Sequence, residues 1–369
     1  MGPLREADEG AAGGRAGRAR RGASRAAAAG PALAAAVLLQ VLLPAGPPAP
    51  PPGSVPAPPA ASAPLPASRA AGPPAGPAAR PAAGRPSKTA AGARSGRERC
   101  ADGGDPAASL RPSDGAGPAV RRIRRAGRLV VGVDQNSYLW GYRDPSSGEL
   151  AGFDIDLVRF LAEELLGEDP EIVYKTIPTD RRIAALRRRE VDMVVRTMSI
   201  TCDRRAEVAF STAYFEAGQQ ILAPRSSPVT GFDATLRGRR LCTAAGSTAQ
   251  ALLERDARGA YPVYADHQLD CLVRLQLGEV DAVMTDSALA AGQAAQDPSV
   301  HLVGGPLTTE PYGVAMNLRD GDLVRRVNKA LEDYRRGGGN SRWTAAYKRW
   351  LADKMEVADP APPEPVYRD

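Results

Sequence analysis

The sequence predicts an α/β protein made of two lobes, which follow a long N-terminal region without a hydrophobic core. Residues 1 to about 119 are dominated by Ala, Gly, Pro and Arg, a composition that buries too little apolar surface to offset the entropy lost on ordering. From Arg128 onward, apolar β-branched runs alternate with helical patterns, as in a mostly parallel sheet covered by helices on both faces. After Phe210 the alternation starts again, which predicts a second, smaller α/β unit.

The N-terminal region begins with a pattern typical of exported proteins. Residues 31–43 are uncharged and apolar, and arginines precede them at positions 15, 18, 20, 21 and 25. A basic stretch followed by a short apolar one is typical of a cleaved export signal, and this one is shorter than the roughly 20 residues that span a bilayer. We therefore interpret residues 1–45 as an export signal or anchor and residues 46–119 as a disordered linker, with the globular part secreted or at the cell surface.

The first lobe opens with alternating strands and helices. We expect strands at 128–134, 171–176 and 191–195, and helices at 153–166 and 181–189. In the first helix, Ile155, Val158 and Leu161 fall on one face, and acidic residues stand near its start, where the helix dipole favours them. This β-α-β-α-β order implies parallel strands whose carboxyl ends form the ligand-binding edge of the sheet.

The second unit and the end of the chain continue the pattern. We expect strands at 219–223, 238–243 and 280–285, and helices at 247–255 and 287–292. A further strand at 312–317 precedes two amphipathic helices at 323–336 and 341–351. The tail, residues 353–369, is Pro-rich and is expected to be loose.

Charge and cysteine content exclude several classes of function. The net charge of +6 comes largely from the arginine-rich head, and the globular part interleaves acids and bases without a basic stripe, which argues against nucleic-acid binding.

The four cysteines lack the short paired spacings of a zinc site, so we predict neither a metal nor a cofactor. In an exported protein, disulfides are the default. We favour a Cys242–Cys271 bond within one lobe, while the pairing of Cys100 with Cys202 stays open.

Several short motifs, in this order and spacing, closely resemble the extracellular solute-binding family for polar amino acids of bacterial ABC transporters. They are Gly152-Phe153-Asp154-Ile155-Asp156-Leu157, Ser199-Ile200-Thr201 with Arg204, and Phe210-Ser211. Two further segments, His267-Gln268-Leu269-Asp270-Cys271 and Gly278-Glu279-Val280-Asp281-Ala282, look like actinobacterial glutamate-binding members.

The resemblance implies a periplasmic-binding-protein-like fold of type II with a hinge of two strands. Lobe 1 would comprise residues 120–222 and 312–352, and lobe 2 would comprise residues 223–311. The lobes would close over an amino acid, excluding water and strengthening each charged contact. The partner would be an ABC transporter permease, and the chain would act as a monomer.

A zwitterionic ligand needs a cation for its carboxylate and a carboxylate for its ammonium, because unpaired buried charge is costly. Arg204 sits where the family places the arginine for the α-carboxylate, and Asp286 matches its acid for the α-ammonium. Arg182 aligns with an arginine that glutamate and aspartate binders use for the side-chain carboxylate, which favours an acidic ligand. Glutamate is the preferred ligand, and aspartate, glutamine and asparagine stay open. The structural alternatives are a surface arginine at 204, a helix N-cap at 286 and a solvated helix arginine at 182.

Smaller residues complete the expected site. Thr197, Ser199, Ser247 and Thr248 would present hydroxyl and backbone groups to the ligand, although ordinary loop and cap chemistry explains the same residues. Tyr138 or Trp140 would form an aromatic wall, with core packing as the competing role. Two departures from the family, Arg196 at a usually small position and a missing aromatic residue near Thr179, shift the pocket toward charge recognition.

Two other functional classes are an enzyme on the same lobes and a receptor ectodomain. A dehydratase or lytic enzyme on the same lobes needs a general acid or base in the cleft, but the only histidines, His267 and His301, stand in loop-like stretches, and no nucleophile elbow is present. We therefore predict no enzymatic activity. A receptor ectodomain would retain residues 31–43 as an anchor, and mass spectrometry of the exported protein distinguishes retention from cleavage.

Overall fold

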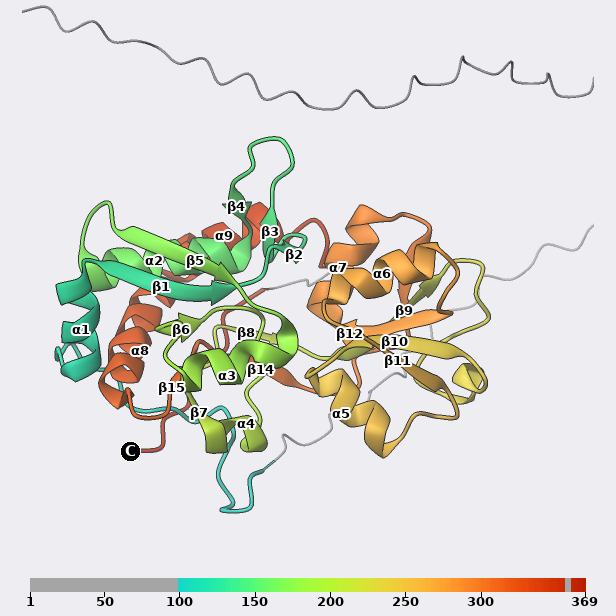
Figure 1. The fold of residues 1–369 in the computed structure, drawn as a ribbon, viewed down its shortest axis with the longest axis horizontal. Helices are drawn as coiled ribbons and strands as arrows, with labels where there is room; N and C mark the ends of the chain where they lie inside the picture. The colour runs from blue at the N-terminus through green and yellow to red at the C-terminus, as the bar shows by residue number, and fades with distance from the viewer. Residues whose placement is uncertain (1–98, 356–359) are drawn as a thin grey trace, which may run out of the picture. The chain divides into compact units, whose positions relative to one another are not determined.

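The structure, a computed structural model, describes residues 99–355 and 360–369, and every structural statement below concerns these residues (Figure 1). The expected export signal (1–45), its apolar segment (31–43) and the part of the expected linker before residue 99 lie outside the described residues.

The first lobe contains a five-stranded sheet in the order β5-β1-β6-β15-β7. Strands β1, β5 and β6 are parallel, whereas β15 runs antiparallel to both β6 and β7. Their bounds are β1 Arg128–Val133, β5 Glu171–Thr176, β6 Met193–Val194, β7 Val208–Phe210 and β15 Ala315–Asn317. The predicted β-α-β-α-β order is therefore confirmed.

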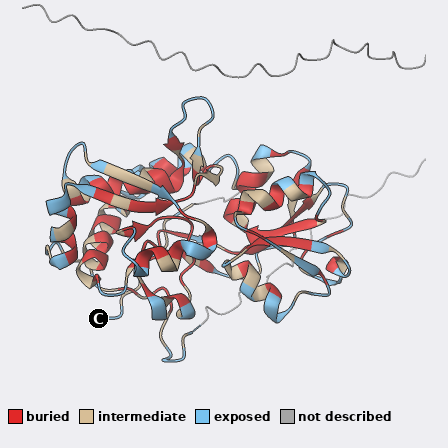
Figure 2. Cartoon of the chain, in the orientation of Figure 1, coloured by how far each residue is buried: buried red, intermediate tan, exposed pale blue. Residues whose placement is uncertain are grey.

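Helices cover both faces of this sheet. One face packs against four helices: α1 (Pro118–Ala126), α2 (Phe153–Leu166), α8 (Gly321–Arg335) and α9 (Arg342–Trp350). The other face packs against α3 (Arg182–Arg187), with α4 (Cys202–Glu207) close by. Alternate residues of β1 serve the two faces, because Leu129, Val131 and Val133 belong to the first core and Val130 contacts the second. The central strands are accordingly buried (Figure 2).

The second lobe repeats the architecture with a sheet in the order β11-β10-β12-β9-β13. Its parallel strands are β10 (Arg240–Ala244), β11 (Tyr261–Ala265) and β12 (Ala282–Asp286), and β9 (Gln219–Pro224) and β13 (Val300–Val303) complete it. Its helices are α5 (Thr248–Arg255), α6 (Gln268–Gln276) and α7 (Ser287–Gln296). The restart of the α/β pattern after Phe210 thus corresponds to a second sheet.

Two short strands join the lobes. Strand β8 (Phe215–Ala217) pairs antiparallel with β14 (Glu310–Tyr312), between the two sheets. The expected single strand at 312–317 is wrong, because β14 belongs to this pair and β15 to the lobe 1 sheet. The expected lobe boundary after residue 222 also differs from the structure, since β9 pairs with β12 and β13 and lies in the second sheet. A three-stranded sheet of β2 (Asn136–Ser137), β3 (Gly141–Arg143) and β4 (Leu150–Ala151) projects from lobe 1.

Both ends of the described chain pack against lobe 1. The backbone of Ser109 exchanges hydrogen bonds with Val366 O and Arg368 N at 2.9 and 3.0 Å, and its hydroxyl accepts from Asn328 Nδ2 at 2.8 Å. A disulfide joins Cys100 to Cys202 at the start of α4. The structure therefore contradicts the expected disorder of residues 99–119 and the expected looseness of residues 360–369. Long-range hydrogen bonds and the disulfide offset the entropy that these segments lose on ordering, which their composition alone does not reveal.

The disulfide Cys242–Cys271 is confirmed, and Cys100–Cys202 forms the second bond. Each bond lies within one lobe: the first joins β10 to α6, and the second joins the N-terminal segment to α4.

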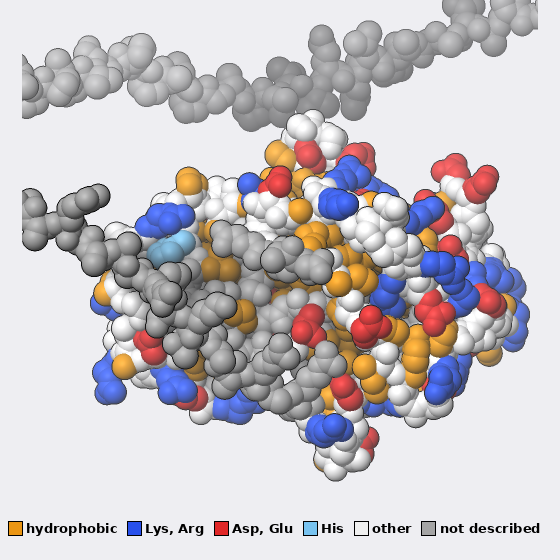
Figure 3. Space-filling view, turned by 180° about the vertical axis from the view of Figure 1, so that it is seen from behind, with side chains coloured by type: hydrophobic (Ala, Val, Ile, Leu, Met, Phe, Trp, Pro, Cys, Tyr) orange, Lys and Arg blue, Asp and Glu red, His pale blue; other side chains and the backbone are white. Residues whose placement is uncertain are grey.

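The described surface carries mixed charge. On the face shown in Figure 3, Lys and Arg side chains alternate with Asp and Glu and form no continuous basic stripe among the described atoms. No helix of the described residues has the length and apolarity needed to cross a membrane.

Candidate functional site

A small cavity lies between the lobes and collects the predicted binding residues. Its volume is about 10 Å³, roughly the room of one water molecule. Every predicted site residue except Tyr138 lines it. The full lining is Arg182, Thr197, Ser199, Arg204, Gln219, Ser247, Thr248, Ala249, Gln268, Thr285 and Asp286.

Arg204 reaches this cavity from the first turn of α4, whose N-cap Thr201 accepts from the backbone N–H of Arg204 at 3.2 Å. Its guanidinium donates from Nη1 to Ser199 O at 2.8 Å and from Nη2 to Gly246 O, in lobe 2, at 3.0 Å. The side chain is buried, so the surface-arginine alternative does not hold at this position.

Arg182 approaches from the start of α3. Its Nε donates to Thr179 O at 2.8 Å, Nη1 donates to Arg196 O at 3.3 Å and Nη2 donates to Gly246 O at 3.5 Å. The residue is 3% exposed, unlike the solvated arginines at positions 187–189 of the same segment. Burial, followed by the charges of Arg204 and Arg196, lowers the pKa of Arg182.

These two guanidiniums share a feature that points to an anionic ligand. Within the described part of the chain, neither forms an ion pair with an acidic side chain, and both donate to carbonyl oxygens instead. Buried cations without a paired anion are costly to a fold, and the planar fork of arginine suits a carboxylate.

Asp286, the last residue of β12, supplies the carboxylate on the opposite side. Although it occupies the N-cap position of α7, its side chain makes no capping bond. Its Oδ2 accepts from Tyr312 Oη at 2.6 Å, and its Oδ1 accepts from Gln219 Nε2. Burial, and secondly the nearby charge of Glu310, raise the pKa of Asp286 to about 7.

The N-terminus of α5 forms the lobe 2 wall. Ser247 is the N-cap, and its Oγ accepts from Gln250 N at 3.1 Å. Thr248 follows in the first turn, and its Oγ1 accepts from Gln219 Nε2 at 3.0 Å. The cap interpretation of Ser247 is thus confirmed, and the same residue also lines the cavity, beside unpaired N–H groups of a kind that favours anions.

Thr197 and Ser199 follow β6 and line the lobe 1 wall. Thr197 adopts a left-handed conformation with φ 41°, which is uncommon for a β-branched residue. Its N–H donates to Asp154 Oδ2 at 2.9 Å, and Tyr214 Oη donates to Asp154 Oδ1 at 2.8 Å. Burial raises the pKa of Asp154 to about 7. Asp154 therefore holds the strained turn that presents Thr197 to the cavity.

Four lining residues were not predicted from the sequence: Gln219, Ala249, Gln268 and Thr285. Gln219 pairs with Asp286 across β9 and β12, and its buried Oε1 has no partner among the described atoms. Gln268 accepts at Oε1 from Thr179 Oγ1 of lobe 1 at 3.3 Å. The sequence held a signal for Ala249 and Thr285, which adjoin predicted residues, and for Gln268, which lies in the motif at residues 267–271.

Arg196, the noted departure from the family, is neutralised inside lobe 1. Its Nη2 lies 3.0 Å from Asp134 Oδ2, and its Nη1 donates to Thr179 Oγ1 at 2.9 Å. Both members of the pair are buried. Arg196 therefore supports Thr179 beneath the cavity and leaves Arg182 and Arg204 as the lining cations.

The structure does not bring the predicted aromatic wall to the cavity. Tyr138 packs edge-on against Tyr142, with ring centroids 5.0 Å apart. Trp140 is buried in lobe 1, and its Nε1 donates across the interface to Ala288 O at 3.1 Å. Trp140 and the backbone of Tyr138, which lies beside Gly292, therefore contribute to the contact between the lobes. The spacing of residues in the sequence does not reveal such a contact.

The two histidines stand away from this cavity. His267 is the N-cap of α6 and His301 lies in β13, and neither lines this cavity. No cluster of three or more His, Cys, Asp or Glu side chains in the described ranges is arranged to hold a metal ion.

Two α/β lobes joined by paired strands, with a charged cavity between them, define the two-lobed solute-binding proteins of type II fold. The chain belongs to the bacterial extracellular solute-binding proteins, family 3, whose profile matches residues 129–353. The resemblance to this family that the motifs indicated is thus confirmed.

Individual relatives differ in the ligand that they are named for. The chain is 32% identical over 231 residues to the ABC transporter glutamine-binding protein GlnH of Bacillus subtilis, covering 63% of this chain and 84% of that protein. It is 25% identical over 217 residues to the glutamate-binding protein GluB of Corynebacterium efficiens, covering 56% and 74%. A solved ancestral arginine-binding protein bound to glutamine superposes with a TM-score of 0.56 at 32% identity, covering 61% of this chain and 98% of that one.

Proposed function

We propose that this chain is the extracellular binding component of an ABC amino-acid importer, and that it captures glutamate, as a monomer, for a membrane permease. The observation that supports this is the pair of buried guanidiniums, Arg182 and Arg204, facing the carboxylate of Asp286 across one cavity. Glutamate carries two carboxylates and one ammonium, so its charges match this set one for one.

Each charged group of glutamate is assigned to particular residues of the site. Arg204 and the N-terminal turn of α5 receive the α-carboxylate, and Asp286 receives the α-ammonium together with the free Oε1 of Gln219. Arg182 receives the side-chain carboxylate. Aspartate offers the same charges on a shorter chain, whereas glutamine and asparagine would leave the Arg182 charge unpaired.

Binding requires the lobes to move. A cavity of about 10 Å³ is too small for glutamate, and both guanidiniums donate to the Gly246 carbonyl of the opposite lobe. Entry of the ligand therefore requires opening at the β8–β14 pair, followed by closure in which ligand oxygens replace Gly246 O as the acceptors.

A thermal-shift screen of the chain against the twenty amino acids, followed by calorimetry, tests the proposal. Ligand at about 100 times its Kd adds roughly 2.7 kcal/mol to the free energy of unfolding. A shift with glutamate, weaker or absent with the neutral amides, supports the proposal. A shift with glutamine alone overturns the specificity, and no shift with any amino acid overturns the function.

Replacing Arg182 is expected to change specificity. Arg182→Ala should weaken glutamate binding at least about tenfold, because it removes one charge-assisted pair of roughly 1.5–3 kcal/mol, and should change glutamine binding less. Arg181→Ala is the matched control, since the side chain of Arg181 is 66% exposed. Equal losses for glutamate and glutamine, measured by calorimetry, would show that Arg182 does not read the side-chain charge.

Binding is expected to weaken in acid. The pKa of Asp286 is raised to about 7, so below pH 7 its carboxyl must lose a proton before it can pair with the ammonium. The Kd for glutamate should therefore rise about tenfold between pH 8 and pH 6, as expected for one protonation, and binding at pH 6 should release close to one proton.

Calorimetry at pH 6 in buffers of different ionisation enthalpy measures that proton. Asp286→Asn should bind weakly and lose the pH dependence, whereas Asp154→Asn, which alters the other carboxyl with a pKa near 7, should retain it. An affinity that stays constant from pH 6 to 8 would contradict the assignment of Asp286 to the ammonium.

A further inference from the structure

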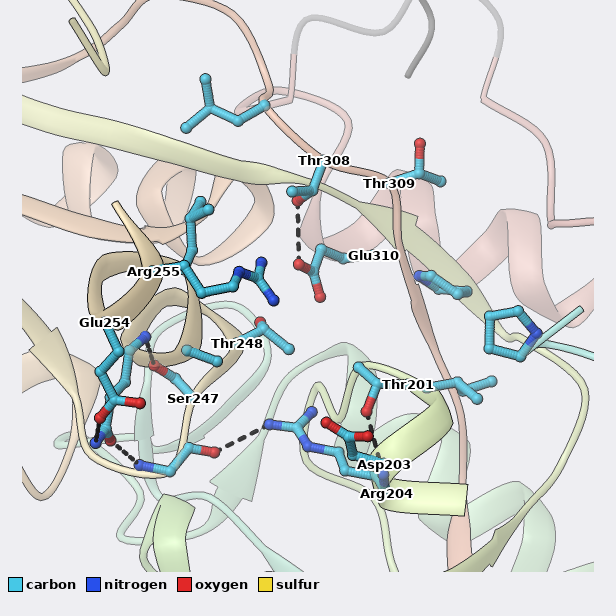
Figure 4. A pocket seen from close by; sticks show the side chains of 18 of the residues that line it. Thr201, Asp203, Arg204, Ser247, Thr248, Glu254, Arg255, Thr308, Thr309 and Glu310 are labelled. Carbon is cyan, nitrogen blue, oxygen red and sulfur yellow. Dashed lines mark hydrogen bonds between the residues drawn. The ribbon is translucent and has the colours of Figure 1, made fainter. Parts of the chain in front are cut away.

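A second and much larger cavity adjoins the first. Its volume is about 530 Å³, within the range of small-molecule sites. It lies between the start of α4, helix α5, residues 307–311 and the N-terminal segment at residues 105–106 (Figure 4). Arg204, Ser247 and Thr248 line both cavities. The two spaces therefore meet at the groups proposed to hold the α-carboxylate.

One wall of the larger cavity comes from outside the part of the chain that matches the family. Asp105 and Pro106 precede residues 129–353. The Cys100–Cys202 disulfide fixes this segment to α4, and Arg205 Nη1 donates to Asp105 O at 2.8 Å. This wall is a built feature of this chain, anchored covalently beside Arg204.

The larger cavity offers both signs of charge. Glu310, 6% exposed, accepts at Oε1 from Thr308 Oγ1 at 3.0 Å. Arg255, at the end of α5, is exposed and makes no ion pair with any described acid. Figure 4 shows both side chains directed into the same space. Asp203 and Glu254 add acidic groups to the lining.

We propose that the larger cavity is a second subsite that takes the C-terminal residue of a dipeptide whose first residue is glutamate. This inference rests on the proposed function. With the free ammonium at Asp286, the peptide carbonyl replaces the α-carboxylate at Arg204, and the chain continues past Ser247 and Thr248. The terminal carboxylate of the second residue pairs with Arg255, and the buried Glu310 favours a basic second side chain.

Two isomeric dipeptides are expected to bind differently, because their lysines leave the glutamate from opposite ends. In α-glutamyl-lysine the lysine leaves from the carboxyl end at Arg204, where the large cavity begins. In γ-glutamyl-lysine it leaves from the side-chain end at Arg182, which does not line the large cavity. Calorimetry on the full chain should show the α isomer binding within about tenfold of glutamate, and the γ isomer binding at least 100-fold more weakly than the α isomer.

Arg255→Ala tests the subsite directly. It should weaken α-glutamyl-lysine about tenfold and leave glutamate unchanged, while Arg239→Ala, in the same lobe but lining neither cavity, should change neither. Equal binding of the two isomers, or no effect of Arg255→Ala on the α isomer, overturns the second subsite. Glutamate binding without dipeptide binding overturns the subsite alone, whereas failure of both ligands overturns the proposed function as well.

Discussion

Arg204→Ala is expected to weaken binding of every amino acid by about 30-fold or more. Truncating one partner of a buried, hydrogen-bonded charge pair costs roughly 2–5 kcal/mol, and the α-carboxylate that Arg204 is proposed to hold is common to all amino acids. The loss should therefore be similar for glutamate and glutamine, in contrast to Arg182→Ala. Calorimetry with both ligands measures it.

Two controls separate binding from folding. Arg204→Lys keeps the charge but loses the planar fork, so it should fall between the wild type and Arg204→Ala. Arg187→Ala, at an exposed arginine of the same lobe, should bind normally. The melting temperature of ligand-free Arg204→Ala should stay close to that of the wild type, because the substitution also removes a buried cation that lacks a described acidic partner. Normal amino-acid binding by Arg204→Ala would disprove the carboxylate assignment.

Gly292→Ala is expected to stabilise lobe 2 while it impairs binding by at least about tenfold. Gly292 lies within α7, where alanine is favoured over glycine by about 1 kcal/mol. A Cβ at this position, however, would lie 2.6 Å from the backbone O of Tyr138 in lobe 1. A backbone atom cannot swing aside as a side chain can, so the added methyl group should hold the lobes apart without unfolding either one.

The Gly292→Ala experiment needs two readouts. Calorimetry gives the Kd for glutamate, and small-angle scattering at saturating glutamate should give a larger radius of gyration than the wild type. Gly305→Ala is the matched control in the same lobe, because its added Cβ would meet nothing within 4 Å. An unchanged Kd together with wild-type compactness would show that the lobes accommodate the methyl group and that Gly292 does not limit closure.

The sequence predicted those helices and strands that are determined by a local pattern of residues. The bounds of α2 and β5 were predicted to the residue, because helical periodicity and a short β-branched run are complete within their own windows. Residues 312–317 look like one apolar strand, yet β14 and β15 pair with partners in different sheets. Strand pairing is a tertiary property, so hydrophobicity along the chain did not reveal this division.

In the site, too, locally recognisable residues were predicted, whereas residues brought in by tertiary contacts were not. Arg204 stands in a recognisable motif and Asp286 follows a predicted strand, and the proposed zwitterionic ligand requires both a cation and a carboxylate. Gln219 joins them only through the register of β9 against β12, and Gln268 only through the meeting of the lobes. One wall of the large cavity comes from residues 105 and 106, which composition assigned to a disordered linker.

The two disulfides stabilise the individual lobes and leave the movement between the lobes free of covalent links. One bond closes part of lobe 2, and the other ties the N-terminal segment to lobe 1, so neither joins the two lobes. Formation of these bonds therefore stabilises each lobe against unfolding without adding a covalent link across the hinge. Reducing agents should therefore lower the melting temperature of each lobe, with much less effect on how far the lobes open.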